Sequence, residues 1–295
     1  MSNKCLSVDK EMLRTARKQF CLDIGLDFEA YLANPNEKCY ICKAKYTPGT
    51  CSPAAEGARC YDGKDSFFKA IICMGQLFLA VDEDIYDWAV ETFSDCQPQW
   101  FCEYGNLRMI DRKLQEYGRE IADTHVYFLP AQEQPDVGKC EFPLQWFEQE
   151  DILQFKEKNQ FTSALSFWNN QPDMLAVAAL KKADVSAETE EKQGSESQVR
   201  ASDCSEEHPQ EKMAGMAGVS RDGEFLWQIG INVRKEYAGK GLAVQLVTEM
   251  KQEVIRRGKV PFYGTSESHI ISQTVGLKAG FAPAWTEIYV RTIEK

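Results

Sequence analysis

The segment of this sequence most able to do chemistry is a short apolar strand that leads through two glycines into a long helix. The strand ends with residues 230–233, and the turn contains Gly239 and Gly241. The first backbone N–H groups of a helix have no partner within the helix, and the helix dipole adds positive potential there. Glycines also let the backbone approach a ligand closely. The segment therefore predicts a site for an anion such as a pyrophosphate.

Two common phosphate-binding patterns do not fit this turn. A P-loop needs Lys followed by Ser or Thr after its last glycine, and here Leu242 and Ala243 follow. The dinucleotide-binding pattern needs a third glycine, and Val244 stands in that place. A glycine turn with no ligand remains the alternative for this segment taken alone.

Two motifs together resemble those of the GNAT superfamily of acetyltransferases. The coenzyme A motif of that family is Arg or Gln, two residues, Gly, one residue, then Gly or Ala, and residues 238–243 match it except at Ala238. The family often has Asn, two residues, Ser and a helix ending in Lys-x-Gly-Phe. Here His269 takes the Asn position, Ser272 matches, and residues 278–281 complete the pattern. The resemblance covers roughly residues 140–295.

The resemblance implies how acetyl-coenzyme A is bound. In the family the fourth and fifth strands splay apart, the pantetheine arm pairs with the fourth strand, and the pyrophosphate lies on the helix N-terminus. A backbone N–H near Val233 then polarises the thioester carbonyl. The implied cofactor residues are Ile231, Asn232, Val233, Ala238, Gly239, Lys240, Gly241, Leu242, Ala243, Val244 and Ser272.

Acetyl transfer also needs a base for the ammonium and an acid for the leaving thiolate. Glu224 and Asp222 are candidate bases, although residues 221–224 also fit a purely polar turn. The tyrosine that serves as acid in the family is replaced by Gly276. Tyr263, Ser268, Ser272 or water are possible substitutes. His269 is a candidate base or acid, or simply the start of a helix.

Alternating patterns place these residues on a mixed α/β (α+β) fold. Apolar periodicity predicts a GNAT-like, mostly antiparallel sheet with helices on both faces. The expected strands are 174–180, 213–219, 225–233, 261–265 and 284–291, and the expected helices are 148–158, 242–257 and 268–279. Residues 140–295 form the predicted acetyltransferase domain. Residues 182–212, almost without large apolar side chains, are predicted to be a disordered insertion.

Residues 1–139 are predicted to form a separate α/β domain. The patterns indicate a strand at 70–81, a helix at 83–93 with Asp82 as N-cap, an amphipathic helix at 107–121 and a strand at 126–129. This order fits a degenerate copy of a GNAT half-fold or an unrelated α/β unit. Either could wall the acceptor site.

Composition narrows the class of partner. The net charge of -11 disfavours sequence-independent nucleic-acid binding and is compatible with a cationic substrate. Without a secretory signal or an apolar run long enough for a membrane span, we expect a cytoplasmic monomer or homodimer that binds neither membrane nor nucleic acid. Cys39, Cys42, Cys51 and Cys60 could ligate zinc, but their spacing favours scattered thiols, and no metal is expected.

These patterns predict an N-acetyltransferase that moves an acetyl group from the co-substrate acetyl-coenzyme A to an amine by direct attack in a ternary complex. The acceptor is expected to be a small-molecule or peptide amine. The alternatives are a non-catalytic acyl-coenzyme A binding module, suggested by Ala238 and Gly276, and an interaction protein that works through its acidic insertion.

Overall fold

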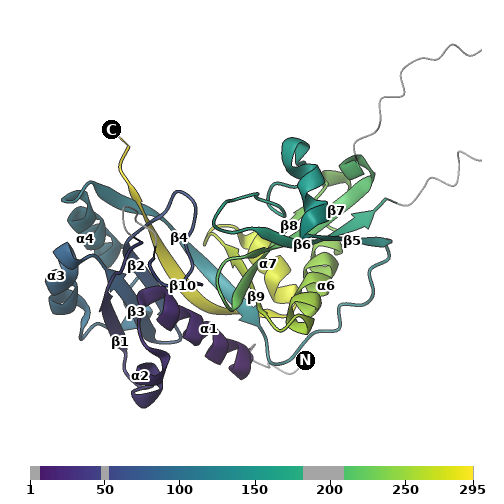
Figure 1. Ribbon diagram of the computed structural model, residues 1–295. Helices are drawn as coiled ribbons and strands as arrows, with labels where there is room; N and C mark the ends of the chain where they lie inside the picture. The colour runs from purple at the N-terminus through teal and green to yellow at the C-terminus, as the bar shows by residue number, and fades with distance from the viewer. Residues whose placement is uncertain (1–6, 48–52, 182–208, 295) are drawn as a thin grey trace, which may run out of the picture.

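The computed structural model describes residues 7–47, 53–181 and 209–294, and these residues form one ten-stranded sheet (Figure 1). The strands are β1 (Cys39–Lys43), β2 (Asp65–Cys73), β3 (Gln76–Val81), β4 (Arg119–Pro130), β5 (Leu144–Glu148), β6 (Asp173–Leu180), β7 (Met213–Arg221), β8 (Leu226–Val233), β9 (Val260–Thr265) and β10 (Phe281–Thr292). Their spatial order is β1-β3-β2-β10-β4-β9-β8-β7-β6-β5. Among these strands, β1–β3 and β8–β9 are parallel neighbours and the other pairs are antiparallel.

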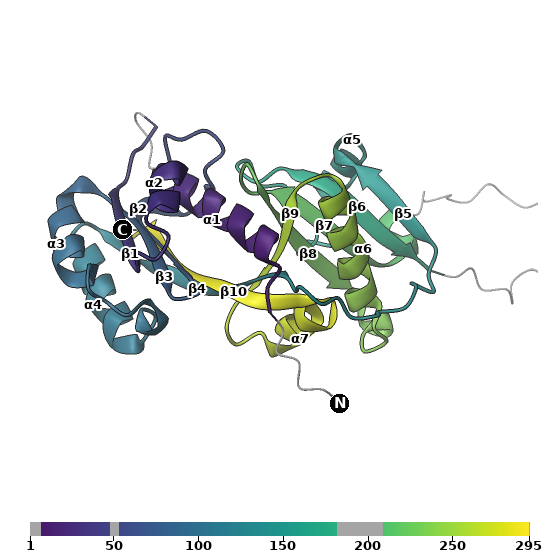
Figure 2. The same cartoon turned by 90° about the horizontal axis from the view of Figure 1, so that it is seen from below.

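Helices cover both faces of this sheet. They are α1 (Lys10–Ile24), α2 (Phe28–Ala33), α3 (Glu83–Phe93), α4 (Tyr104–Gln115), α5 (Gln149–Ile152), α6 (Leu242–Arg256) and α7 (Ile270–Lys278), with 3-10 turns η1 (Pro98–Trp100), η2 (Leu153–Lys158), η4 (Pro209–Lys212) and η5 (Lys235–Tyr237). Helices α1, α2 and α5 pack on one face, called here the α1 face, and α3, α4, α6 and α7 on the other, the α6 face. In Figure 2, α1 lies along the middle of the molecule, between the α3–α4 pair and α6. The predicted fold class, a mixed and mostly antiparallel sheet covered on both faces, is confirmed.

The two halves of the chain share this sheet. Strand β4, from the first half, pairs with both β9 and β10, and β10 also pairs with β2. The paired stretch of β10 and β4 is long, from Phe281–Pro130 to Thr292–Arg119. The predicted boundary at residues 139 and 140 falls in the connector between β4 and β5. Hydrogen bonds between strands therefore join the regions on either side of that boundary.

Predictions for the first half were partly wrong. Helix α3 is confirmed, and the Asp82 side chain caps it by accepting the Asp84 N–H. Residues 70–81 are not one strand, because a turn at Met74 and Gly75, both with positive φ, divides them into β2 and β3. The amphipathic helix stops at Gln115, since the chain turns there into β4. Helix α1 was not predicted, although its Asp9 cap and terminal Gly25 are typical helix signals.

Predictions for the second half agree better with the structure. The five predicted strands and the helices at 242–257 and 268–279 are confirmed within a few residues. The predicted helix at 148–158 is only one α-turn followed by a 3-10 turn. Residues 182–208 of the predicted insertion lie outside the described residues. The predicted C-terminal end of the insertion, residue 212, is wrong, because residues 209–212 form η4, whose Gln210 is buried. Within the described ranges no helix is long and apolar enough to cross a membrane.

Candidate functional site

The parallel pair β8–β9 opens partway along its length. The two strands pair only from Leu226–Val260 to Ile229–Tyr263, although β8 continues to Val233. Through that extension β8 stays paired with β7 on its other side. The sheet therefore has a split that begins just after Ile229 and Tyr263, as the resemblance implied.

Backbone groups of β8 face this split. The N–H of Arg234 donates to the carbonyl of Ala214, at 2.9 Å, on the β7 side. Because peptide groups alternate along a strand, Ile231 and Val233 direct theirs away from β7, toward the split. No strand of the described residues pairs with them there. They are free to hydrogen-bond an extended ligand, as an added strand would.

The glycine turn stands at the end of the same strand, before α6. Gly239 and Gly241 have φ of 76° and 83°, values that favour glycine. Gly241 is the N-cap of α6 and has no side-chain cap, and the Gln245 N–H bonds back to its carbonyl. A Cβ added at either glycine would meet no atom within 4 Å, so the turn is open. These features are those of an anion site at a helix N-terminus.

The other predicted cofactor residues lie around these two features. Leu242 is buried in the α6 core, so only its backbone can serve a ligand, and Ala243 and Val244 continue the first turn. Ala238 and Lys240 are exposed on the turn, and the Lys240 ammonium donates to the Glu236 carbonyl at 3.1 Å.

Two hydroxyl groups lie at the apex of the split, on the α6 face. Tyr263 is the last residue of β9 to pair with β8. Its hydroxyl forms a hydrogen bond of 2.8 Å with the hydroxyl of Ser272 on α7. Burial raises the pKa of Tyr263, and the bond to Ser272 opposes that shift, so the phenol keeps its proton at neutral pH. A Cβ on Gly276 would lie 3.1 Å from the Tyr263 ring. The ring therefore occupies space beside the position where the resemblance leads one to expect a tyrosine.

On the α1 face the split borders a cavity of about 160 Å³. It is lined by Thr162, Ser163, Ala164, Ser166, Trp168, Gln171, Asp173, Ser220, Asp222, Gln228 and Gly230. Asn232 fixes its wall, because its side-chain oxygen accepts the N–H groups of Ser163 (2.6 Å) and Ala164 (3.0 Å). Of the predicted cofactor residues, Asn232 thus has a side chain that organises the neighbouring cavity.

Two buried polar side chains line this cavity. Asp222 and Gln171 are only 4% and 1% exposed. Asp222 Oδ1 accepts from Ser220 at 2.6 Å, and the Gln171 amide nitrogen donates to the Cys60 carbonyl. The Tyr61 hydroxyl also forms a hydrogen bond with the Asp222 carboxyl group, whereas Gln171 Oε1 has no hydrogen-bond partner among the described residues.

The electrostatics of Asp222 suit a proton acceptor. Burial raises its pKa to about 7, against the lowering effects of Ser220, of the Arg59 guanidinium and of the nearby Tyr61 hydroxyl. A carboxyl with such a pKa exchanges a proton near neutral pH. Asp222 was one of two candidate bases in the sequence, and the structure places it in the cavity.

The first half of the chain supports the loop that lines this cavity, although none of its described residues is in the lining. The Asp62 carboxylate accepts the N–H groups of Asn169 (2.9 Å) and Asn170 (3.2 Å). Behind them the fully buried Arg59 is ion-paired with Asp23 and Glu287. The sequence analysis missed Gln171 and Arg59, because single polar residues in irregular segments give no periodic signal.

Glu224 and His269, two of the predicted catalytic residues, lie on the surface. Glu224 is exposed on the β7–β8 turn, where its carboxylate lies 3.8 Å from the Lys259 ammonium, and it does not line the cavity. His269 is the exposed N-cap residue of α7 and makes no side-chain cap hydrogen bond. Tyr263, by contrast, lies at the split, beside Ser272.

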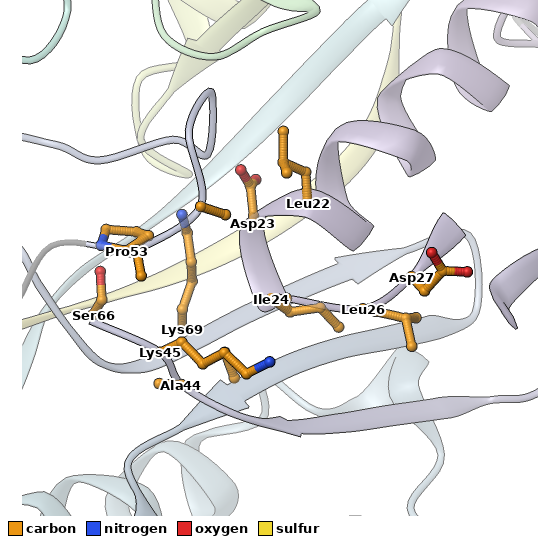
Figure 3. Close-up of a pocket in the computed structure, with 14 residues that line it drawn as sticks. Leu22, Asp23, Ile24, Leu26, Asp27, Ala44, Lys45, Pro53, Ser66 and Lys69 are labelled. Carbon is orange, nitrogen blue, oxygen red and sulfur yellow. The ribbon is translucent and has the colours of Figure 1, made fainter. Parts of the chain in front are cut away.

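The described residues also line a larger cavity, of about 450 Å³, between the end of α1 and strands β2 and β3 (Figure 3). Figure 3 shows Lys69 and Asp23 on one side of it. The Lys69 ammonium donates to the Arg59 carbonyl at 2.6 Å, so this cavity borders the Arg59 cluster from the other side.

The four cysteines weighed as zinc ligands are not seen to form a metal centre. Cys51 lies outside the described residues, and Cys39 Sγ contacts Cys96 Sγ at 3.6 Å. No group of three potential ligands lies together in the part of the chain that the structure describes.

Comparison with known proteins finds likeness only among solved structures. No protein-family profile matches the sequence, and no curated protein matches it. A putative GNAT acetyltransferase from Novosphingobium aromaticivorans DSM 12444 is 16% identical, with 59% of this chain and 68% of that chain covered and a TM-score of 0.36. A GNAT acetyltransferase from Colwellia psychrerythraea is 11% identical (58% and 56% covered, TM-score 0.36). A GCN5-related N-acetyltransferase-like protein from Streptococcus suis 89/1591 is 12% identical (80% and 89% covered, TM-score 0.42). At such identities the similarity concerns the fold alone.

Proposed function

We propose that this protein is an N-acetyltransferase that moves an acetyl group from acetyl-coenzyme A to a primary amine in a ternary complex. The observation that carries the proposal is the position of the β8–β9 split. On one side it continues to an uncapped helix N-terminus, and on the other it borders a cavity lined by the buried side chains of Asp222 and Gln171. A donor bearing pyrophosphate and a cationic acceptor would meet there.

In the donor half, the backbone of this chain does the binding. N–H groups of residues 239–244 hold the pyrophosphate, and the peptide groups of Ile231 and Val233 pair with the pantetheine arm. The Val233 N–H donates to the thioester oxygen, where negative charge develops during attack. No metal is needed for these contacts.

In the acceptor half, Asp222 takes one proton from the bound ammonium. The freed amine nitrogen attacks the thioester carbonyl carbon, forming the new C–N bond as the C–S bond breaks. Tyr263 gives a proton to the departing sulfur, directly or through Ser272, and its own proton is replaced from solvent. The amide nitrogen loses its extra proton to solvent, and Asp222 also returns its proton to solvent, which gives amide, free coenzyme A and the starting form of the enzyme.

Transfer is tested with purified full-length protein, acetyl-coenzyme A and a panel of primary amines, following thiol release and the acetylated product together. We expect release that depends on the amine and is lost in Asp222→Asn. Glu224→Gln serves as the matched control, because that carboxylate is exposed, and it should retain activity. Equal loss in both variants, or no coenzyme A binding at millimolar ligand, would reject the proposal.

A second candidate, a non-catalytic acyl-coenzyme A binding module, is favoured by Ala238 and Gly276, which replace functional residues of the family motif. It predicts tight coenzyme A binding without thiol release for any amine.

For an interaction protein that uses the insertion, deletion of residues 183–207 should abolish function. The deletion stops there because Gln210 is buried and accepts the Gln160 N–H at 2.7 Å.

A further inference from the structure

We propose that the acceptor is a compact primary amine with no carboxylate beside its ammonium group, and not a free amino acid. This inference rests on the proposed function and concerns the cavity at Asp222 and Gln171. It follows from the hydrogen-bonding groups that line the cavity and from those that are already engaged.

Six backbone N–H donors of the 163–170 loop are already occupied. The Asn232 side chain takes the N–H groups of Ser163 and Ala164. Asp173 takes those of Ser166 (3.4 Å) and Phe167 (2.8 Å), while Asp62 takes the next pair along the loop. Three side chains thus bind six backbone donors in one loop.

No basic side chain replaces them. The described residues that line the cavity include neither lysine nor arginine. The nearest buried cation, Arg59, is ion-paired with both Asp23 and Glu287. A substrate carboxylate placed here would lose its hydration without gaining a counter-ion, which is strongly unfavourable.

The charged groups that line the cavity are acidic. Asp222 and Gln171 contribute acceptor oxygens to the lining, and a primary ammonium carries three N–H donors. The Asp173 carboxylate lies in the same lining and adds negative potential. A substrate carboxylate would be repelled by these oxygens, whereas an ammonium satisfies them.

The size and lining of the cavity limit the part of the substrate that is attached to the ammonium group. The cavity, about 160 Å³, is below the roughly 300–1,000 Å³ of typical drug-sized sites. Trp168, 49% exposed, offers an aromatic surface on its lining. A short hydrocarbon or single-ring body attached to the ammonium would pack against that surface.

Matched pairs of amines test the inference, because each pair differs only in the carboxylate. Tyramine is compared with tyrosine, and phenethylamine with phenylalanine, using saturating acetyl-coenzyme A. We expect kcat/KM to be at least tenfold higher for the amine that lacks the carboxylate. Where turnover is too slow to measure, calorimetric affinity for the protein–coenzyme A complex gives the same comparison. Equal or better use of the amino acids overturns the inference.

A charge added to the cavity wall sharpens this test. Thr162→Lys places a cation on the exposed part of the lining, and Thr162→Gln is its uncharged control of similar length. In the lysine variant, the ratio of kcat/KM for the amine to kcat/KM for its matching amino acid should fall at least threefold. In the glutamine variant this ratio should stay unchanged. An unchanged ratio in both variants contradicts the charge argument. Transfer to amino acids in preference to amines refutes this inference alone, while failure to bind coenzyme A refutes the proposed function.

Discussion

The carbonyl oxygen of Ser163 lies 1.9 Å from the point where a Cβ on Gly230 would be. The 161–165 segment can rest on β8 only because residue 230 has no side chain. The carbonyl oxygen of Ala164 likewise lies 2.0 Å from the point where a Cβ on Gly218 of β7 would be. A glycine in a central strand weakens it, so the close approach of this segment explains why both strands contain one here.

Replacing Gly230 by Ala should displace the 161–165 segment from the sheet. We expect a loss of stability of about 2 kcal/mol, as for overpacked cores, and a several-fold higher KM for the amine with little change in coenzyme A affinity. Gly105→Ala is the control, because a Cβ there meets no atom within 4 Å. Urea denaturation and calorimetry measure both effects, and a Gly230→Ala protein as stable as Gly105→Ala would contradict the packing described.

The strand–turn–helix unit of the proposed donor side could be predicted from the sequence because it depends on local backbone conformation. Gly239 and Gly241 sit in positive-φ positions of a strand–turn–helix unit, and such units leave local signals in the sequence. The acceptor side could not be predicted in this way. Gln171 and Asp222 line one cavity because β6 and β7 pair across the long stretch of sequence between them, and the Arg59 guanidinium lies near Asp222 from the first half. Glu224 looked equivalent to Asp222 in the sequence, and burial alone separates them.

Asp222 should control the pH dependence of transfer. With its pKa near 7, it is ionised and able to accept a proton only above that pH, so kcat/KM should rise with pH to a plateau just above 7. Asp222→Asn should lower kcat/KM by about a hundredfold or more and remove this limb of the profile. Ser220→Ala removes the 2.6 Å hydrogen bond that favours the carboxylate, so the limb should move to higher pH. A limb that stays in place in both variants would assign the titration to another group.

The same carboxyl should affect stability in the opposite sense. Because its folded-state pKa is raised from 3.8 to about 7, the folded protein binds the proton more tightly than the unfolded chain. This contribution to stability is fully present below about pH 4 and is lost as pH rises through 7. The free energy of unfolding of the wild type should therefore fall, relative to Asp222→Asn, by about 4 kcal/mol between pH 4 and pH 8. A difference that is constant with pH would show that Asp222 does not change its pKa on folding.

Arg59 should be essential for folding. It is fully buried between Asp23 and Glu287, and both carboxylates would stay buried without a counter-ion if it were removed. Arg59→Met should cost about 3–5 kcal/mol, the range seen when one partner of a buried ion pair is lost. Arg291→Gln breaks the exposed pair with Glu120 and should cost less than about 1 kcal/mol. Thermal unfolding of the two variants compares them directly, and similar losses would show that the buried cluster is more solvated than described.

Gly241 provides the sharpest test of the donor site. An Asp at this position adds bulk and negative charge where the pyrophosphate is proposed to bind, so coenzyme A affinity should fall by about thirtyfold or more, equivalent to about 2 kcal/mol. Because φ is 83° at Gly241, the substitution also strains the backbone and should lower the melting temperature. Gly258→Asp separates the two effects, since Gly258 has a φ of 75°, equally open surroundings and a place at the opposite end of α6. Both variants should lose similar stability, and only Gly241→Asp should lose affinity by calorimetry. Retained affinity in Gly241→Asp would place the coenzyme A pyrophosphate elsewhere on the protein.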